Sequence, residues 1–142
     1  MHGAGWTFWV VGWNLLLQWT QRRNFSIPRM NPIDAGFSKM GLDRAQRHAF
    51  LCTGPDCCSM QDGLAVWEVL KERTAALGIP AMRTKAACFR ICSGGPWMAV
   101  YPEGVWYGAL TPEKCRRIAE EHLAGGRPVE EWVVRRHPLG AG

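Results

Sequence analysis

The feature that most constrains this chain is the placement of its cysteines. Six cysteines are present, and five of them fall into two short segments. The first segment holds Cys52, Cys57 and Cys58, and the second holds Cys88 and Cys92. Such clustering indicates metal ligands, whereas a disulfide framework is expected in a short secreted chain with a signal peptide. The N-terminus lacks the basic segment that opens such a peptide, so we expect reduced thiols and a cytoplasmic protein.

Length and composition fit one globular domain with tails. The chain has 142 residues, close to the size of a single domain. Hydrophobic residues make up 47% and charged residues 20%, which excludes wholesale disorder and a collagenous or mucin-like chain. The net charge of +5 is small and scattered, so we expect no nucleic-acid partner.

The N-terminal extension, residues 1–43, begins with a hydrophobic stretch. Residues 1–19 contain no acidic or basic side chain other than His2, and hold four of the eight tryptophans. This length approaches that of a membrane helix, but Asn14, Gln18 and three glycines disfavour an anchor. The alternatives are an interfacial amphipathic helix, a poorly ordered tail, or a translated extension preceding a natural start at Met30 or Met40. Residues 20–43 are predicted to be a linker.

Strands and helices alternate in the domain that follows, residues 44–127. Residues 48–52 and 81–84 are predicted strands, and residues 97–101 and 105–108 are predicted to form a hairpin around a Pro-Glu-Gly turn. Apolar residues at helical spacing predict a helix over residues 63–77. A second helix is expected to start at Thr111 and Pro112 and to end at the glycine pair 125–126.

This order predicts an α/β protein. It suits a thioredoxin-like sandwich, with a mixed four-stranded sheet and two main helices, preceded by the hydrophobic extension. Residues 128–142 are expected to form a C-terminal tail. Cys115 and His122 fall on the apolar stripe of the last helix, so we expect both to be packed structural residues, as we do His48.

The cysteine spacing favours an iron–sulfur cluster over zinc. Four residues separate Cys52 from Cys57, five separate it from Cys58, and three separate Cys88 from Cys92. Each group follows a predicted strand, and four cysteines are the usual ligands of a [2Fe-2S] cluster. Zinc ribbons usually have two residues between paired cysteines. The glycines after Cys92 are expected to let backbone N–H groups approach the cluster sulfurs.

The residues also resemble a known family, the thioredoxin-like [2Fe-2S] ferredoxins. The resemblance covers about residues 44–138 and lies in the segments HAFLCTGPDCC, RTKAACFRICSGGPWMAVYPEGVWYGALTPE and EEHLAGGRPVEEWV. The chain is also similar to the two-iron small subunit of NADH dehydrogenase. The resemblance implies a thioredoxin-like fold, a [2Fe-2S] cluster held by four cysteines, one-electron transfer and a homodimer.

The adjacent cysteines leave two possibilities for the second ligand. The gap of four residues after Cys52 favours Cys57 and matches the respiratory subunit. Counting back from the helix favours Cys58, because a helix register is rigid while the preceding loop varies in length. We favour Cys58, so the predicted cluster ligands are Cys52, Cys58, Cys88 and Cys92, with Cys57 as the alternative.

The leading interpretation is a ferredoxin, an electron carrier that is no enzyme by itself but can serve as a component of an oxidoreductase complex. Its partner is expected to be a redox protein, and Arg90 in the second segment either tunes the cluster, steers an acidic partner or is merely solvated. The alternative function is a zinc-stabilised interaction module. A thioredoxin-like thiol enzyme ranks last, because the chain has no Cys-x-x-Cys pair.

Overall fold

The computed structural model describes residues 30–140. The possibilities raised for residues 1–19, including a membrane anchor, lie outside these described residues. Within residues 30–140, no helix has both the length and the apolar character needed to span a bilayer. The strands and the helices packed on them belong to one compact unit that spans residues 33–142.

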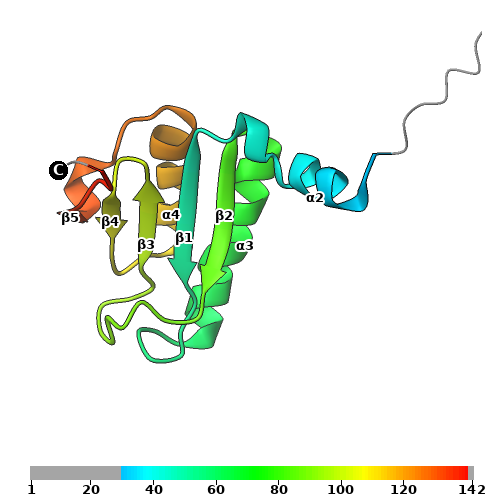
Figure 1. The fold of residues 1–142 in the computed structure, drawn as a ribbon. Helices are drawn as coiled ribbons and strands as arrows, with labels where there is room; N and C mark the ends of the chain where they lie inside the picture. Colours follow the sequence, from blue (N-terminus) through cyan, green and yellow to red (C-terminus); the bar gives the residue numbers. More distant parts are fainter. Residues whose placement is uncertain (1–29, 141–142) are drawn as a thin grey trace, which may run out of the picture. The chain divides into compact units, whose positions relative to one another are not determined.

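The sheet has five strands in the order β2-β1-β3-β4-β5 (Figure 1). β1 (Arg47–Cys52) pairs with β2 (Ala81–Ala86) in parallel. The remaining neighbours, β3 (Met98–Tyr101), β4 (Val105–Tyr107) and β5 (Val133–Arg136), are antiparallel. The predicted mixed sheet is therefore confirmed, but it has one strand more than the four expected, and the additional strand comes from the C-terminal tail.

Both main helices pack on the same face of the sheet, behind it in the view of Figure 1. α3 (Met60–Ala76) is capped by Ser59, whose side chain accepts from the N–H of Asp62. α4 (Pro112–Ile118) is capped by Thr111 and has proline in its first turn, as predicted. It continues into a π-helical segment, η2 (Ala119–Ala124), so the last predicted helix changes its hydrogen-bond pattern halfway.

The core lies between the sheet and these helices. Along β4, Val105 and Tyr107 are fully buried while Trp106 between them is half-buried, so Trp106 lies on the face away from the helices. The helices add fully buried side chains from α3, α4 and η2, which are Val66, Leu70, Cys115, Ile118, Ala119, His122 and Leu123. The predictions that Cys115 and His122 are packed residues are confirmed.

The predicted linker contains a helix. α2 (Pro32–Met40) begins with proline, has Asp34 in its first turn and Lys39 in its last, and buries none of its residues. A proline at the first position and charges that complement the helix dipole favour this helix locally. Gly41, at φ 77°, follows it and precedes the short 3-10 helix η1 (Leu42–Arg44).

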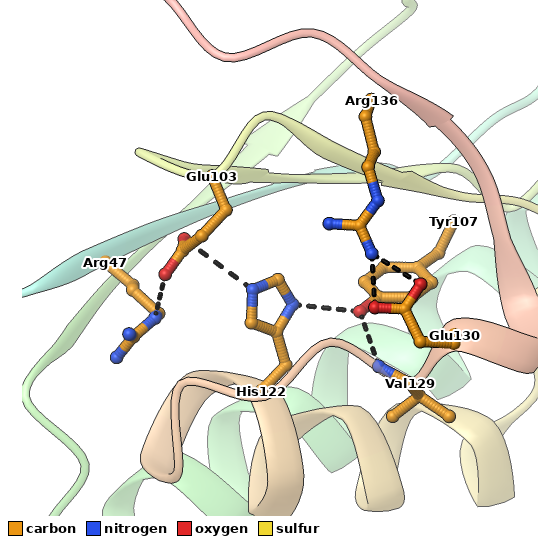
Figure 2. A network of polar contacts seen from close by, with 7 residues as sticks. All are labelled: Arg47, Glu103, Tyr107, His122, Val129, Glu130 and Arg136. Atoms are coloured by element: carbon orange, nitrogen blue, oxygen red, sulfur yellow. Dashed lines mark hydrogen bonds and ion pairs between the residues drawn. The ribbon is translucent and has the colours of Figure 1, made fainter.

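A buried polar network holds the C-terminal segment against the sheet (Figure 2). The hydroxyl of Tyr107 lies 2.9 Å from Nδ1 of His122 and accepts from the N–H of Val129 at 3.1 Å. Val129 is buried and precedes the 3-10 helix η3 (Glu130–Trp132), which leads into β5. The network therefore fixes the residues from which the unexpected fifth strand starts.

Candidate metal centre

The first cysteine loop is bounded by β1 and α3. Cys52 is the last residue of β1, where Ala49, Leu51 and Cys52 itself are buried. The loop brings Sγ of Cys57 to 2.9 Å from Sγ of Cys52 and to 3.7 Å from Sγ of Cys58. Cys57 is buried, whereas Cys58 is half-buried. The three sulfurs of this loop therefore form one contiguous group at the end of β1.

The second cysteine loop leaves the same end of the sheet. The parallel register pairs Cys52 with Ala86, the last residue of β2, and Cys88 follows two residues later. The carbonyl of Ala87 lies 3.8 Å from Sγ of Cys52. Cys88 and Cys92 are exposed on this loop. The parallel register therefore starts both cysteine loops at the same edge of the sheet.

Backbone hydrogen bonds join the two loops to the segment that follows. The N–H of Cys52 donates to the carbonyl of Trp97 at 2.9 Å, and the N–H of Thr53 donates to the carbonyl of Ala86 at 3.2 Å. The N–H of Gly95 donates to the carbonyl of Cys57 at 3.1 Å. These bonds position the first loop from two sides, so its cysteines do not rely on the metal alone for their placement.

Two glycines let the backbone approach the cysteines. A Cβ at Gly95 would lie 2.8 Å from both the carbonyl oxygen and Sγ of Cys57. A Cβ at Gly63, in the first turns of α3, would lie 2.6 Å from the backbone of Thr53. Real Cβ atoms do not reach such distances, so only glycine allows the loop after Cys92 and the start of α3 to pack this closely on the first loop.

One backbone donor reaches a cysteine sulfur in the second loop. The N–H of Arg90 donates to Sγ of Cys88 at 3.1 Å, and Arg90 has a φ of 60°. Sequence analysis expected the glycines after Cys92 to supply such donors, but the N–H of Gly95 goes to a carbonyl instead. A left-handed arginine cannot be predicted from its residue type, because glycine and asparagine are the residues that favour this region.

Burial raises the pKa of the Cys57 thiol. The pKa of Cys57 is raised to about 12, first by burial and then by hydrogen bonds to Cys52 and Cys58. A metal ligand must be a thiolate, so metal binding to this loop would release protons. Burial also raises the pKa of Cys115 to about 12. The Cys115 thiol donates to the carbonyl of Val66 at 3.5 Å, away from the cysteine loops.

The cysteines of the two loops can supply the ligands of a two-iron cluster. A [2Fe-2S] cluster needs two protein ligands on each of its two irons, and cysteines in two adjacent loops can supply two pairs. All six cysteines are free, so none is withdrawn into a disulfide. The residues present therefore fit a two-iron cluster.

The histidines of the domain serve other contacts. Nε2 of His48 lies 2.8 Å from the hydroxyl of Thr84, and the ring stacks on Phe50. His122 belongs to the network around Tyr107. The contacts of both histidines are thus with residues outside the cysteine loops, in agreement with the prediction that both are structural.

The geometry defines a thioredoxin-like α/β protein with a cysteine centre at one end of its sheet, and comparisons with known proteins identify the family. No protein-family model matches the sequence. A 2Fe-2S ferredoxin of Aquifex aeolicus is 33% identical over 98 residues, which is 62% of this chain and 88% of that protein. A 2Fe-2S ferredoxin of Clostridium pasteurianum is 33% identical over 63% of this chain and 96% of its own length.

Comparison with solved structures gives the same kind of protein. A structure of a thioredoxin-like [2Fe-2S] ferredoxin from Aquifex aeolicus matches with a TM-score of 0.59 and 32% identity, and the match covers 69% of this chain and 99% of that one. The chain belongs to the thioredoxin-like [2Fe-2S] ferredoxins. Its cofactor is a [2Fe-2S] cluster, and it is an iron–sulfur electron carrier rather than an enzyme. The predicted family, fold and cofactor are confirmed, and nothing favours the zinc module.

Proposed function

We propose that Cys52, Cys58, Cys88 and Cys92 hold the [2Fe-2S] cluster, which when bound supplies reversible one-electron chemistry. The observation that carries this proposal is the parallel register of β1 and β2, which pairs Cys52 with Ala86 and so starts both cysteine loops side by side. Four thiolates from two adjacent loops are the ligand set that such a cluster takes.

The choice of Cys58 is supported by its position at the start of α3. Cys58 directly precedes Ser59, the N-cap of a 17-residue helix, so the start of α3 fixes its place in the loop. Its side chain is half-buried, so a ligand there leaves one edge of the cluster near solvent. Cys57 is the alternative, since its sulfur is the one that lies 2.9 Å from that of Cys52.

The protein tunes the centre through groups that surround the second loop. The Arg90 N–H on Sγ of Cys88 favours the more negative, reduced state of the proposed cluster, because hydrogen bonds to the sulfurs are one of the determinants of potential. The redox partner is proposed to be a reductase or oxidoreductase that meets the exposed second loop.

The adjacent cysteines provide a matched pair for testing the ligands. Cys57→Ser and Cys58→Ser should be purified anaerobically and compared with Cys88→Ser by iron and sulfide content, visible absorption and EPR after dithionite reduction. We expect Cys58→Ser and Cys88→Ser to lose or alter the cluster spectrum, and Cys57→Ser to retain it. A normal spectrum in Cys58→Ser together with an altered one in Cys57→Ser would assign the ligand to Cys57.

We also propose that the chain forms a homodimer, as the family resemblance implies. The sheet face opposite the helices carries the half-buried aromatic side chains of Phe50 and Tyr101, whose rings form a T-shaped pair with centroids 6.2 Å apart. Aromatic residues are enriched at such contacts. Light scattering of the purified holoprotein should give twice the chain mass, and a mass of one chain would reject the dimer.

A further inference from the structure

An apolar groove of about 450 Å³ lies beside the second cysteine loop. One of its walls is Ile91, which stands between Cys88 and Cys92 in the chain. Trp97, Trp106, the β5 residues 134–136 and His137 complete it, and we call it the β5 groove. Ile91 and Val134 are exposed there, so the β5 groove has an apolar lining open to solvent.

Two residues of the β5 groove contact the chain neighbours of the proposed cluster ligands. The ring of Phe89, next to Cys88, forms a T-shaped pair with the ring of Trp106, and their centroids are 5.2 Å apart. The indole N–H of Trp97 donates to the carbonyl of Ser93, next to Cys92, at 2.8 Å. A molecule seated in the groove would therefore touch side chains that adjoin both ligands of the second loop.

One arginine without an ion pair lines the groove, and another directly precedes a residue of its lining. Arg135 lines it, and Arg90 precedes Ile91 in the cysteine loop. Both are exposed, and neither forms an ion pair with any residue from 30 to 140. Arg136, by contrast, is held by Glu130. Free guanidinium groups beside an apolar surface match a partner that presents carboxylates.

We propose that the β5 groove is the docking surface for an acidic redox protein. The partner places an apolar side chain between Trp97, Trp106 and Val134, and its carboxylates meet Arg90 and Arg135. This inference rests on the proposed function, because it requires Cys88 and Cys92 to hold the cluster. A second copy of this chain is a poor occupant of this groove, since a symmetric contact there would bring the same free arginines together.

The test measures electron transfer to two haem proteins of opposite charge. The dithionite-reduced holoprotein is mixed in a stopped-flow instrument with ferric cytochrome b5, an acidic probe, or ferric cytochrome c, a basic one. One electron leaves the reduced cluster and the ferric haem becomes ferrous, with no change in covalent bonds. The variants are Arg90→Gln with Arg135→Gln, and Val134→Glu on the groove wall. The matched control is Arg44→Gln with Arg127→Gln, which removes the same charge at exposed positions that do not line the groove.

We expect the groove double variant to slow transfer to cytochrome b5 about fivefold or more at low ionic strength, and to speed transfer to cytochrome c. The difference should vanish at high salt, and Val134→Glu should act in the same direction. The control should change either rate less than about twofold, because steering depends on where the charge lies. Potentials measured for every variant separate docking from a change in driving force.

Two results would overturn the docking surface. One is an equal effect of the groove and control variants, which would mean that net charge alone matters. The other is a groove variant that changes the holoprotein from dimer to monomer without changing its electron-transfer rates. That result would mean that a second copy of the chain occupies the groove. In both cases the wild-type spectrum remains that of a two-iron cluster. Failure of the proposed ligands would appear instead as an unaltered spectrum in Cys88→Ser.

Discussion

The phenol oxygen of Tyr107 lies 2.9 Å from Nδ1 of His122 (Figure 2). The same oxygen accepts from the N–H of Val129 and has a second lone pair, so the phenol can either donate to the imidazole or accept from it. The tautomer of a neutral His122 decides which, and Nδ1 is the acceptor when the ring proton is on Nε2. That atom faces a carboxylate oxygen of Glu103 at 3.6 Å, too far for a hydrogen bond, while Glu103 accepts from Arg47 at 2.7 Å.

Removing the hydroxyl tests this arrangement. Tyr107→Phe leaves the buried Nδ1 of His122 and the N–H of Val129 without a partner, so we expect the free energy of unfolding to fall by about 1–3 kcal/mol. Tyr101→Phe, at a half-buried position on the open face, is the matched control and should cost much less. Urea unfolding followed by far-UV circular dichroism gives both values. Equal losses in the two variants would contradict the network.

The same network predicts how stability depends on pH. Burial lowers the pKa of His122 below 6.5, against the opposing effect of Glu103 and with smaller lowering contributions from Arg47 and Arg136. Below pH 6.5 the unfolded chain therefore binds a proton that the folded chain does not. The contribution of His122 to the free energy of unfolding is complete above its pKa in the unfolded chain. It is lost as the pH falls through the pKa of His122 in the folded chain, by at most about 1.4 kcal/mol per pH unit.

The measurement is urea unfolding between about pH 7.5 and pH 5, restricted to conditions where the cluster absorption is unchanged. His122→Gln should reduce the decline of the free energy of unfolding with falling pH. His48→Gln is the comparison variant. Burial also lowers the pKa of His48, but that histidine is half-buried and should contribute less. An undiminished decline in His122→Gln would assign the pH dependence to other groups.

Much of the domain could be predicted because local patterns and tertiary structure agree. β1 and the hairpin of β3 and β4 lie where apolar runs and the Pro-Glu-Gly turn predicted them. α3 begins at Met60 rather than at the predicted residue 63, because Ser59 caps it by accepting from the N–H of Asp62. β5 was missed because its formation depends on contacts distant in sequence, such as that between Val129 and Tyr107.

The candidate site was predictable to a similar extent. The number and spacing of the cysteines indicated a two-iron cluster, because four cysteines are its usual ligands and their positions can be read directly from the sequence. The donor to Sγ of Cys88 was not predictable, since the left-handed backbone of Arg90 is imposed by the folded loop. The β5 groove was not predictable either, because it requires β5, which the sequence patterns did not reveal.

Gly95 offers a test of how the cysteine loops are held together. An alanine Cβ there would lie 2.8 Å from Sγ of Cys57, so we expect Gly95→Ala to displace the first loop. The free energy of unfolding should fall by about 1–3 kcal/mol, and iron per chain should decrease. Gly36→Ala in α2 is the control, because nothing lies within 4 Å of its Cβ position. Full iron content in Gly95→Ala would show that the loop adapts.

Gly104 tests whether β5 depends on the β3–β4 turn. Gly104 has a φ of 63°, its carbonyl accepts from the N–H of His137 at 2.7 Å, and a Cβ would lie 2.1 Å from the carbonyl oxygen of His137. Gly104→Ala should therefore strain the turn and separate β5 from β4, at a cost of roughly 2 kcal/mol or more. Hydrogen exchange should accelerate in residues 133–137 before it does in β1. Because β5 supplies one side of the β5 groove, the variant should also slow transfer to cytochrome b5 while leaving the cluster spectrum intact. Unchanged exchange in β5 would mean that the contacts of Val129 and Trp132 hold the strand without the turn.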